Sequence, residues 1–207
     1  MNERDLLSRW TARNYFSLVA PVLASIWSSR RHAGSSDLRG LVVGLDGELP
    51  ELADRDFQDT ELTGVDFSFA RFSCSFSRCK MTCCAFERAR FDTCRMVASR
   101  YYETSFRAAT FMAPMFSDAT LESCDLTGAV MRGRGAKAYG GRRAEFRRCR
   151  LEGVRVIGLE LRACTFADCS FAGAVFERCV LAGVRFDGCA PSHEQFKECE
   201  LLSTLVK

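Results

Sequence analysis

Large apolar residues recur at every fifth position along most of the chain, and this period is the strongest pattern in the sequence. Between Phe76 and Val206 the five-residue step meets a large apolar side chain at 24 of 27 positions. The exceptions are Ala136, Gly141 and Pro191. Upstream, the same step occurs at Leu52, Phe57, Leu62, Phe67 and Phe72, and a single four-residue step then leads from Phe72 to Phe76.

A second series of positions lies two residues before each large residue and carries small side chains. Eleven of the twelve cysteines fall in this series, where they interchange with Ala, Ser, Thr and Val. Chance would place only about one in five there, so the repeat governs their placement. We therefore expect these cysteines to be reduced, small apolar residues of the core rather than disulfide partners. Cys83 alone falls outside the series, which makes it either a candidate reactive thiol or an incidental surface cysteine.

A period of five matches neither an α-helix, with 3.6 residues per turn, nor a strand, with two. It fits a chain that coils as a square, in which each side is a short extended segment and each corner is a turn. The large residue points inward from the middle of a side, and the small residue fills the space beside it. Four units complete a coil of 20 residues, and stacked coils pair at about 4.8 Å. The pattern therefore predicts an all-β solenoid.

The repeating unit resembles that of the pentapeptide-repeat proteins: a small residue, Asp or Asn, Leu or Phe, and two free positions. Val65-Asp66-Phe67-Ser68-Phe69 and Cys124-Asp125-Leu126-Thr127-Gly128 match it well. The resemblance covers about residues 50–206 and implies a right-handed quadrilateral β-helix. The best-understood members of the family resemble a DNA duplex, bind type II topoisomerase and protect it from quinolones, often with an extruded loop. The C-terminal stretch around Ser192–Leu205 looks like the helical, dimer-forming ending of those proteins, which implies a homodimer through the C-terminus.

Residues 1–40 do not follow the five-residue step, and we expect them to form an N-terminal helical cap on a β-helix that spans residues 41–206. Asn2 is placed to cap a helix over about residues 3–14. The apolar stretch Tyr15–Trp27 follows, and Ala33–Asp37 is expected to be a linker. An alternative interpretation is an interfacial helix within residues 1–31 that contacts a membrane or a partner, with Trp10 and Trp27 as anchors.

The segment 132–143 interrupts the pattern, because it places Arg134 and Tyr139 at small positions and Ala136 and Gly141 at inward ones. We expect part of it to be extruded as a basic loop. From 132 to 150 there are eight basic residues against Glu145 alone. The candidate partner-binding residues are Arg132, Arg134, Lys137, Arg142, Arg143, Arg147 and Arg148. A solvated loop, a docking loop for an acidic protein and a contact to nucleic acid all remain open, with nucleic acid the least favoured because Tyr139 is the loop's only aromatic residue.

The net charge of +3 conceals an uneven distribution, because residues 41–131 carry 14 acidic and nine basic residues. The acidic residues of the first coils are Asp46, Glu48, Glu51, Asp54, Asp56, Asp59, Glu61 and Asp66. The composition argues against a highly charged disordered chain, and no apolar run has the roughly 18–20 residues of a membrane-spanning helix.

No motif for catalysis, a cofactor or a metal is evident. The sequence contains only two histidines and no Cys-x-x-Cys pair, so it predicts neither a zinc site nor a nucleophile with its base. We predict a non-enzymatic, cytoplasmic protein that serves as an interaction or scaffold module for a protein partner. The first alternative is a DNA mimic that binds DNA gyrase and gives quinolone resistance. The second is an effector that docks on a membrane or assembly through its N-terminal segment.

Overall fold

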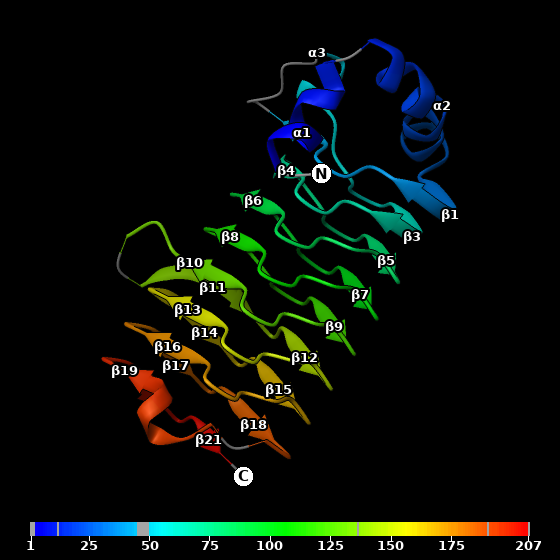
Figure 1. Ribbon diagram of the computed structural model, residues 1–207. Coiled ribbons are helices and arrows are strands. Elements are labelled where there is room, and N and C mark those ends of the chain that lie inside the picture. The colour runs from blue at the N-terminus through cyan, green and yellow to red at the C-terminus, as the bar shows by residue number, and fades with distance from the viewer. Residues whose placement is uncertain (1–2, 12, 45–49, 136, 190, 207) are drawn as a thin grey trace.

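The chain folds into a square solenoid of parallel strands, which confirms the right-handed quadrilateral β-helix with an N-terminal helical cap (Figure 1). The structure is a computed structural model that describes residues 3–11, 13–44, 50–135, 137–189 and 191–206. In each coil the chain passes along four sides, which we number 1 to 4 in the order in which the chain meets them.

Sides 1 and 3 are continuous parallel sheets. Side 1 contains β1 (Arg31–Asp37), β3 (Glu61–Asp66), β5 (Lys80–Thr82), β7 (Arg100–Tyr102), β9 (Thr120–Glu122), β12 (Glu145–Arg147), β15 (Thr165–Ala167), β18 (Arg185–Asp187) and β21 (Leu205–Val206). Side 3 contains β2 (Val42–Gly44), β4 (Arg71–Ser73), β6 (Arg90–Asp92), β8 (Thr110–Met112), β10 (Val130–Arg132), β13 (Arg155–Ile157), β16 (Val175–Glu177) and β19 (Phe196–Lys197).

Sides 2 and 4 are paired more sparsely. Side 2 is joined by single parallel bridges, such as Asp125 with Arg150 and Arg150 with Ser170. On side 4 the N-terminal coils have similar bridges. Its C-terminal coils form a sheet of β11 (Ala138–Arg142), β14 (Leu159–Arg162), β17 (Val180–Ala182) and β20 (Glu200–Leu202). The chain turns sharply after each unit of side 2, where the third residue after the bridge has a positive φ, as at Arg88 and Gly153.

The core is the inward series that the five-residue period predicts. Every described residue of that series from Phe57 to Phe186 is buried. Phenylalanine rings stack from coil to coil along the axis; Phe86 and Phe106 on side 2 are 5.2 Å apart at 7°, and Phe91 and Phe111 on side 3 are 4.7 Å apart at 8°. Offset stacking of this kind adds to the free energy gained by burying the rings.

The N-terminal residues cover the first coil, with α1 (Glu3–Ser8), a 3-10 turn (Arg9–Thr11) and α2 (Arg13–Ser29) at that end of the rod (Figure 1). Trp10 is buried and donates its indole N–H to the Arg39 carbonyl, and Trp27 donates to the Asp56 carbonyl. The Asn2 cap lies outside the described residues. The expected linker at Ala33–Asp37 is wrong, because these residues belong to β1, which pairs with β3. Their polar sequence does not predict a strand, and the backbone hydrogen bonds to β3 make them one.

Two insertions leave the solenoid at the same corner, between sides 3 and 4. The first separates Val43 on side 3 from Phe57 on side 4 and includes α3 (Pro50–Ala53). The second separates Met131 on side 3 from Gly141 on side 4. Within the segment 132–143 the extruded loop is shorter than predicted, because Arg132 ends β10 and β11 begins at Ala138. The loop comprises residues 133–137, and its described part, residues 133–135 and 137, projects from the rod in Figure 1.

Candidate interaction sites

The seven basic residues singled out in the sequence are all exposed, but they form a belt rather than a patch. They follow one coil from the end of side 3, through the loop and side 4, to the corner after side 1. A single flat partner surface therefore cannot meet all of them.

Most of this belt is neutralised by acidic residues, which in most of the pairs belong to a neighbouring coil. Arg134 binds Asp92 at 2.6 Å, and Lys137 binds Glu200 at 2.6 Å, so the loop is tied to the rod in both directions. Arg143 makes two hydrogen bonds to Asp118. The remaining pairs are Arg147 with Glu145, Arg148 with Glu122 and Arg150 with Asp125.

Two basic residues of the belt differ from the others. Arg132 and Arg142 are exposed and have no ion pair with any described residue. Arg132 ends β10 on side 3 and Arg142 ends β11 on side 4, and Tyr139, also on β11, is 42% exposed. The Tyr139 hydroxyl forms a 2.9 Å hydrogen bond with Ser117 Oγ, which positions the ring. We call Arg132, Tyr139 and Arg142 the loop corner.

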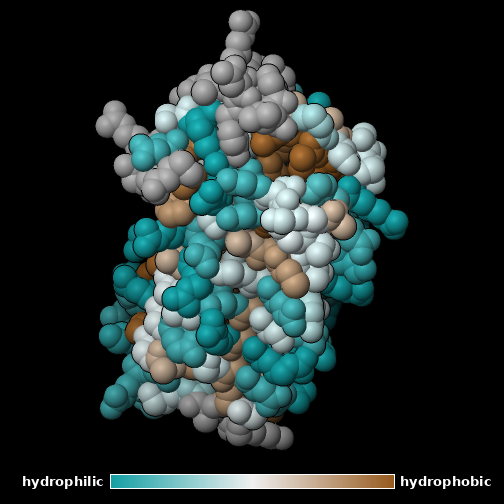
Figure 2. Space-filling model, turned by 45° about the vertical axis from the view of Figure 1, so that its right-hand side comes forward, coloured by the Kyte–Doolittle hydropathy of each residue, from teal (hydrophilic) through white to brown (hydrophobic). Residues whose placement is uncertain are grey.

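The acidic first coils are likewise paired with basic residues. Asp59 binds Arg78 at 2.7 Å, Glu61 binds Lys80 at 2.9 Å, and Asp56 binds Arg30 at 3.0 Å. Asp46 and Glu48 lie outside the described residues. The outer surface seen in Figure 2 is largely hydrophilic, with hydrophobic surface gathered near the N-terminal end.

Asp125 on side 2 is the most strongly held carboxylate of the middle coils. Burial would raise its pKa, but hydrogen bonds from Thr127 and from Arg107 and Arg150 outweigh burial and lower the pKa to about 2. Its side chain is only 14% exposed. This network ties three successive coils together on side 2.

Cys83 is exposed at the corner after side 1, as its phase predicts. Partial desolvation and the nearby Glu103 carboxylate raise the pKa of its thiol. Its Sγ donates to Glu103 Oε2 at 3.5 Å. Because the thiolate is the reactive form, this surrounding disfavours nucleophilic chemistry at neutral pH.

The other eleven cysteines are free thiols, and the structure gives them a role beyond filling space. Cys124 Sγ donates to the Tyr101 carbonyl at 3.4 Å, and Cys149 Sγ donates to the Leu121 carbonyl at 3.3 Å. Thr104 stands in the same column and makes the same kind of bond to the Met81 carbonyl. The small position thus favours residues with a short donor, which explains why Cys, Ser and Thr interchange there.

Gly141 occupies an inward position without a side chain. A Cβ there would lie 3.2 Å from the Phe116 carbonyl carbon, and φ is +153°. The neighbouring coils cannot fill the space, and an apolar cavity of about 20 Å³ remains beside Met131 and Phe146. A cavity of this size can hold one water but offers it no polar partner, so we expect it to be dry.

One histidine has a contact that the sequence did not reveal. His32 Nε2 lies 2.8 Å from Ser36 Oγ on β1. No carboxylate orients the imidazole among the described contacts, so the pair lacks the third member of a catalytic triad. The described residues contain no cluster of His, Cys, Asp and Glu that could hold a metal ion.

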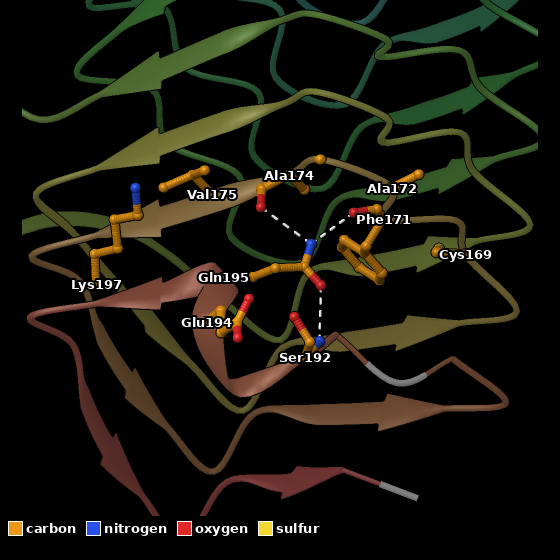
Figure 3. A pocket seen from close by; sticks show the side chains of 10 residues that line it. Cys169, Phe171, Ala172, Ala174, Val175, Ser192, Glu194, Gln195 and Lys197 are labelled. Carbon is orange, nitrogen blue, oxygen red and sulfur yellow. Dashed lines mark hydrogen bonds between the residues drawn. The ribbon is translucent and has the colours of Figure 1, made fainter.

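An open groove of about 630 Å³ lies on side 2 near the C-terminal end (Figure 3). Phe171 and Cys169 line its apolar part, and Glu194 and Lys197 stand at its rim. The Gln195 amide crosses the groove and donates to the carbonyls of Phe171 and Ala174 at 2.6 and 3.0 Å. One sign of this site is visible in the sequence, because Pro191 interrupts the series of large apolar residues at this point.

Comparison with known proteins identifies the repeat. Residues 70–156 match the family model described as pentapeptide repeat region, and residues 160–190 match the one described as pentapeptide repeats (8 copies). No curated protein matches the sequence.

Several solved structures share the architecture. HetL, a pentapeptide repeat protein involved in heterocyst differentiation regulation from the cyanobacterium Nostoc sp. strain PCC 7120, is 14% identical with a TM-score of 0.57, covering 90% of this chain and 91% of its own. QnrB1, a plasmid-mediated fluoroquinolone resistance protein, is 17% identical with a TM-score of 0.46, covering 84% and 83%. At these identities the likeness concerns the fold alone.

Proposed function

The chain belongs to the pentapeptide-repeat proteins, and we propose that it is a non-enzymatic interaction module that docks a protein partner through the loop corner. One observation carries the proposal. Where the other basic residues of the belt have acidic partners, Arg132 and Arg142 have no ion pair with a described residue, and the strand that carries Arg142 also carries the exposed Tyr139. Arg and Tyr are among the residues enriched at the energetic centre of protein interfaces.

The partner that fits this corner presents an acidic surface. Two guanidinium groups bind carboxylates without first breaking an internal ion pair, and Tyr139 adds apolar contact with a fixed ring. Direct binding to nucleic acid is less favoured, because the paired arginines leave no continuous basic track along the rod.

The experiment compares partner capture by three forms of the full chain. Deletion of residues 133–137 joins Arg132 to Ala138 and restores a five-residue step from Met131 to Gly141, so the solenoid keeps its register. The second variant is Arg132→Glu with Arg142→Glu. The control is Arg95→Glu with Arg100→Glu, which changes the charge equally one coil or more away.

We expect the charge-reversal variant to lose the partner at least tenfold and the control to retain it. The deletion leaves Arg132, Tyr139 and Arg142 in place and shows whether the loop itself contributes. Fixed-length crosslinks from the partner should fall next to β10 and β11. If the charge-reversal variant folds and recovers the same partners as wild type, the proposal is wrong.

A topoisomerase-binding DNA mimic is the first alternative, and the charge distribution weighs against it. A duplex mimic needs a continuous acidic face, whereas the acidic residues here alternate with arginines in ion pairs from coil to coil. A gyrase supercoiling assay with a fluoroquinolone decides the matter, because a mimic would restore supercoiling in proportion to its concentration.

An effector docked through residues 1–31 is the second alternative. The indoles of Trp10 and Trp27 bind the solenoid, which supports a capping role, while the hydrophobic surface near this end in Figure 2 keeps the alternative open. Among the described residues, no helix has the length and apolarity to cross a membrane. Liposome flotation that depends on residues 1–31 would favour this alternative.

We also propose that the C-terminal end forms a homodimer. The helical ending expected from the sequence is wrong, because apart from the 3-10 turn His193–Gln195 the described C-terminal residues form β19, β20 and β21. No described strand pairs with the outer edge of these three strands, and Leu202 and Leu205 are 53% and 49% exposed there. Proteins rarely leave such an edge uncovered. Light scattering after gel filtration should show a dimer that Leu202→Glu disrupts, and a wild-type monomer at all concentrations would contradict it. The free thiols accord with a cytoplasmic location, which also remains a proposal.

A further inference from the structure

The outer surface of side 3 differs from that of side 1 in the middle coils. In both sheets the second residue of each strand belongs to the inward series, so the first and third residues point outward. On side 3, β8, β10 and β16 place Met112, Val130 and Val175 outward, and all three are half-buried. We call these three residues the apolar strip. On side 1, β9, β12 and β15 place small polar, charged or alanine side chains outward: Thr120, Glu122, Glu145, Arg147, Thr165 and Ala167.

None of the described helices covers the strip. In Figure 1 the helices lie at the two ends of the rod, away from the outer faces of β8, β10, β13 and β16. Ile157 of β13 also points outward, but it is already buried and adds nothing to the strip. Side 3 therefore leaves apolar surface partly open to solvent in the middle of the rod.

Two arginines stand in register with the strip. Arg155 of β13 pairs with Val130 on one neighbouring strand and with Val175 on the other. Arg132 of β10 pairs with Met112 of β8. Both arginines are exposed, so each brings a guanidinium group to the level of the apolar side chains.

The acidic groups on this face are bound by other basic residues. Asp92 of β6 binds Arg134 at 2.6 Å. Glu177 of β16 binds Arg178 at 2.9 Å and lies 3.5 Å from Arg155. Because the loop-corner arginine on β10 has no ion pair with a described residue, the face keeps positive charge beside its apolar strip. That combination suits a partner that is both acidic and apolar.

The spacing of the strip indicates the form of the partner. Val130 and Val175 are two rungs apart, which is about 9.6 Å at the usual distance between paired strands. Two residues of an α-helix that are seven positions apart are separated by about 10.5 Å and point the same way. Residues on one face of an extended strand are about 7 or 13 Å apart, and neither spacing fits. A helix along the rod axis therefore matches the strip better than a strand.

We propose that the strip binds an amphipathic, acidic α-helix of a protein partner, which lies along the rod axis on side 3. Two apolar residues of this helix, seven positions apart, contact Val130 and Val175. An acidic residue between them, four positions after the first, binds Arg155, and a further carboxylate binds Arg132. This inference rests on the proposed function, because it takes Arg132 as a contact to the same acidic partner.

A synthetic peptide serves as the probe. It is a blocked helix of about 18 residues made of alanine and glutamine, with leucine at every seventh position and glutamate four positions after each of the first two leucines. The control peptide has the same composition, but its glutamates stand two positions after the leucines and therefore on the opposite face of the helix. A fluorescent label reports binding to the full chain through polarisation.

The test variant is Val130→Lys with Val175→Lys, which removes the apolar contacts and adds two positive charges. Its matched control is Thr120→Lys with Thr165→Lys on side 1, because these residues also lie two rungs apart, with Glu145 between them. Charge alone would make both variants bind an acidic peptide more tightly. We expect the test variant to bind the probe about tenfold more weakly than wild type, and the control variant to bind it within about twofold of wild type.

Three results would overturn the proposal: a test variant that binds the probe as tightly as wild type, equal binding of the two peptides, or no binding at about 1 mM. A second measurement needs no substitution, because the probe should shift the amide resonances of Val130 and Val175 in the ¹⁵N-labelled wild-type chain. Unchanged resonances at both residues would also overturn the proposal.

Failure of the proposed function is a separate result, in which Arg132→Glu with Arg142→Glu keeps the native partner. Loss of the native partner in that variant, together with undiminished probe binding by the test variant, would overturn the role of the strip alone.

Discussion

Replacement of Phe106 by alanine tests how the stacked core stabilises the solenoid. Phe106 is fully buried on side 2, with its ring 5.2 Å from that of Phe86 and 5.3 Å from that of Tyr101. The backbone around it is hydrogen-bonded to the coil below through its own N–H and that of Ala108. Because the paired coils cannot close over the empty space, we expect Phe106→Ala to cost about 4 kcal/mol, within the range for large-to-small changes in a rigid core.

Phe196 provides a matched control in the last coil. Its ring makes similar contacts with Phe176 at 5.3 Å and Phe186 at 5.8 Å, but it is only partly buried and nothing described lies beyond it. Removing a half-buried ring loses transfer free energy without leaving a closed cavity, so we expect Phe196→Ala to cost about 1–2 kcal/mol.

The assay is urea unfolding followed by two probes. Far-ultraviolet circular dichroism reports the sheets, and tryptophan fluorescence reports the cap, because Trp10 and Trp27 are the only tryptophans. For Phe106→Ala both midpoints should fall together. Equal losses for the two variants, or a loss below about 2 kcal/mol for Phe106→Ala, would refute the idea that rigid coils hold the cavity open.

Three further predictions concern single sites. Asp125→Asn should lower the free energy of unfolding by about 2 kcal/mol at pH 7. The folded pKa of Asp125, about 2, lies below the unfolded value, so its stabilising effect is lost as the carboxylate is protonated. In urea titrations the difference in free energy of unfolding between wild type and variant should therefore vanish as the pH falls from about 5 to 2. Gly141→Ala should lower the thermal midpoint despite the adjacent cavity, because the new Cβ meets the Phe116 backbone, whereas a rise would show that the backbone yields. Cys83 should be the only thiol that reacts rapidly with a disulfide reagent in the folded chain, and Glu103→Gln should accelerate it; an unchanged rate would mean that Glu103 does not hold the thiol.

The repeat could be predicted from the sequence because each unit obeys one local rule. A large inward residue every five positions gives the length of each side of the coil, the residues of the core and the small positions that carry cysteine. None of these requires knowledge of the neighbouring coils. β1 shows the limit of that rule: Ala33–Asp37 has no large inward residue, and only its pairing with β3 makes it a strand.

The interaction sites could not be predicted in the same way, because charges are compensated between coils. Counting along the chain gives a strongly basic segment, yet Arg143 meets Asp118 and Arg148 meets Glu122, residues 25 and 26 positions earlier. Before the loop the corresponding separation is 19, as between Arg78 and Asp59. Opposite charges separated by the length of one coil could have predicted these ion pairs. That length, however, is known only once the five residues 133–137 are recognised as a loop outside the coil.

The loop at 133–137 also bears on how this chain avoids folding in a second way. Its length equals one repeat, so the same residues could form a side instead of a loop, and every later coil would then be rotated by a quarter turn with its inward series intact. Arg134 opposes that register slip, because it would bring a charge into the core, whereas Gly141 takes an inward position in either register. The arginine thereby marks the register, and sequences that replace it with a small, repeat-like residue should display their C-terminal surface in a new direction.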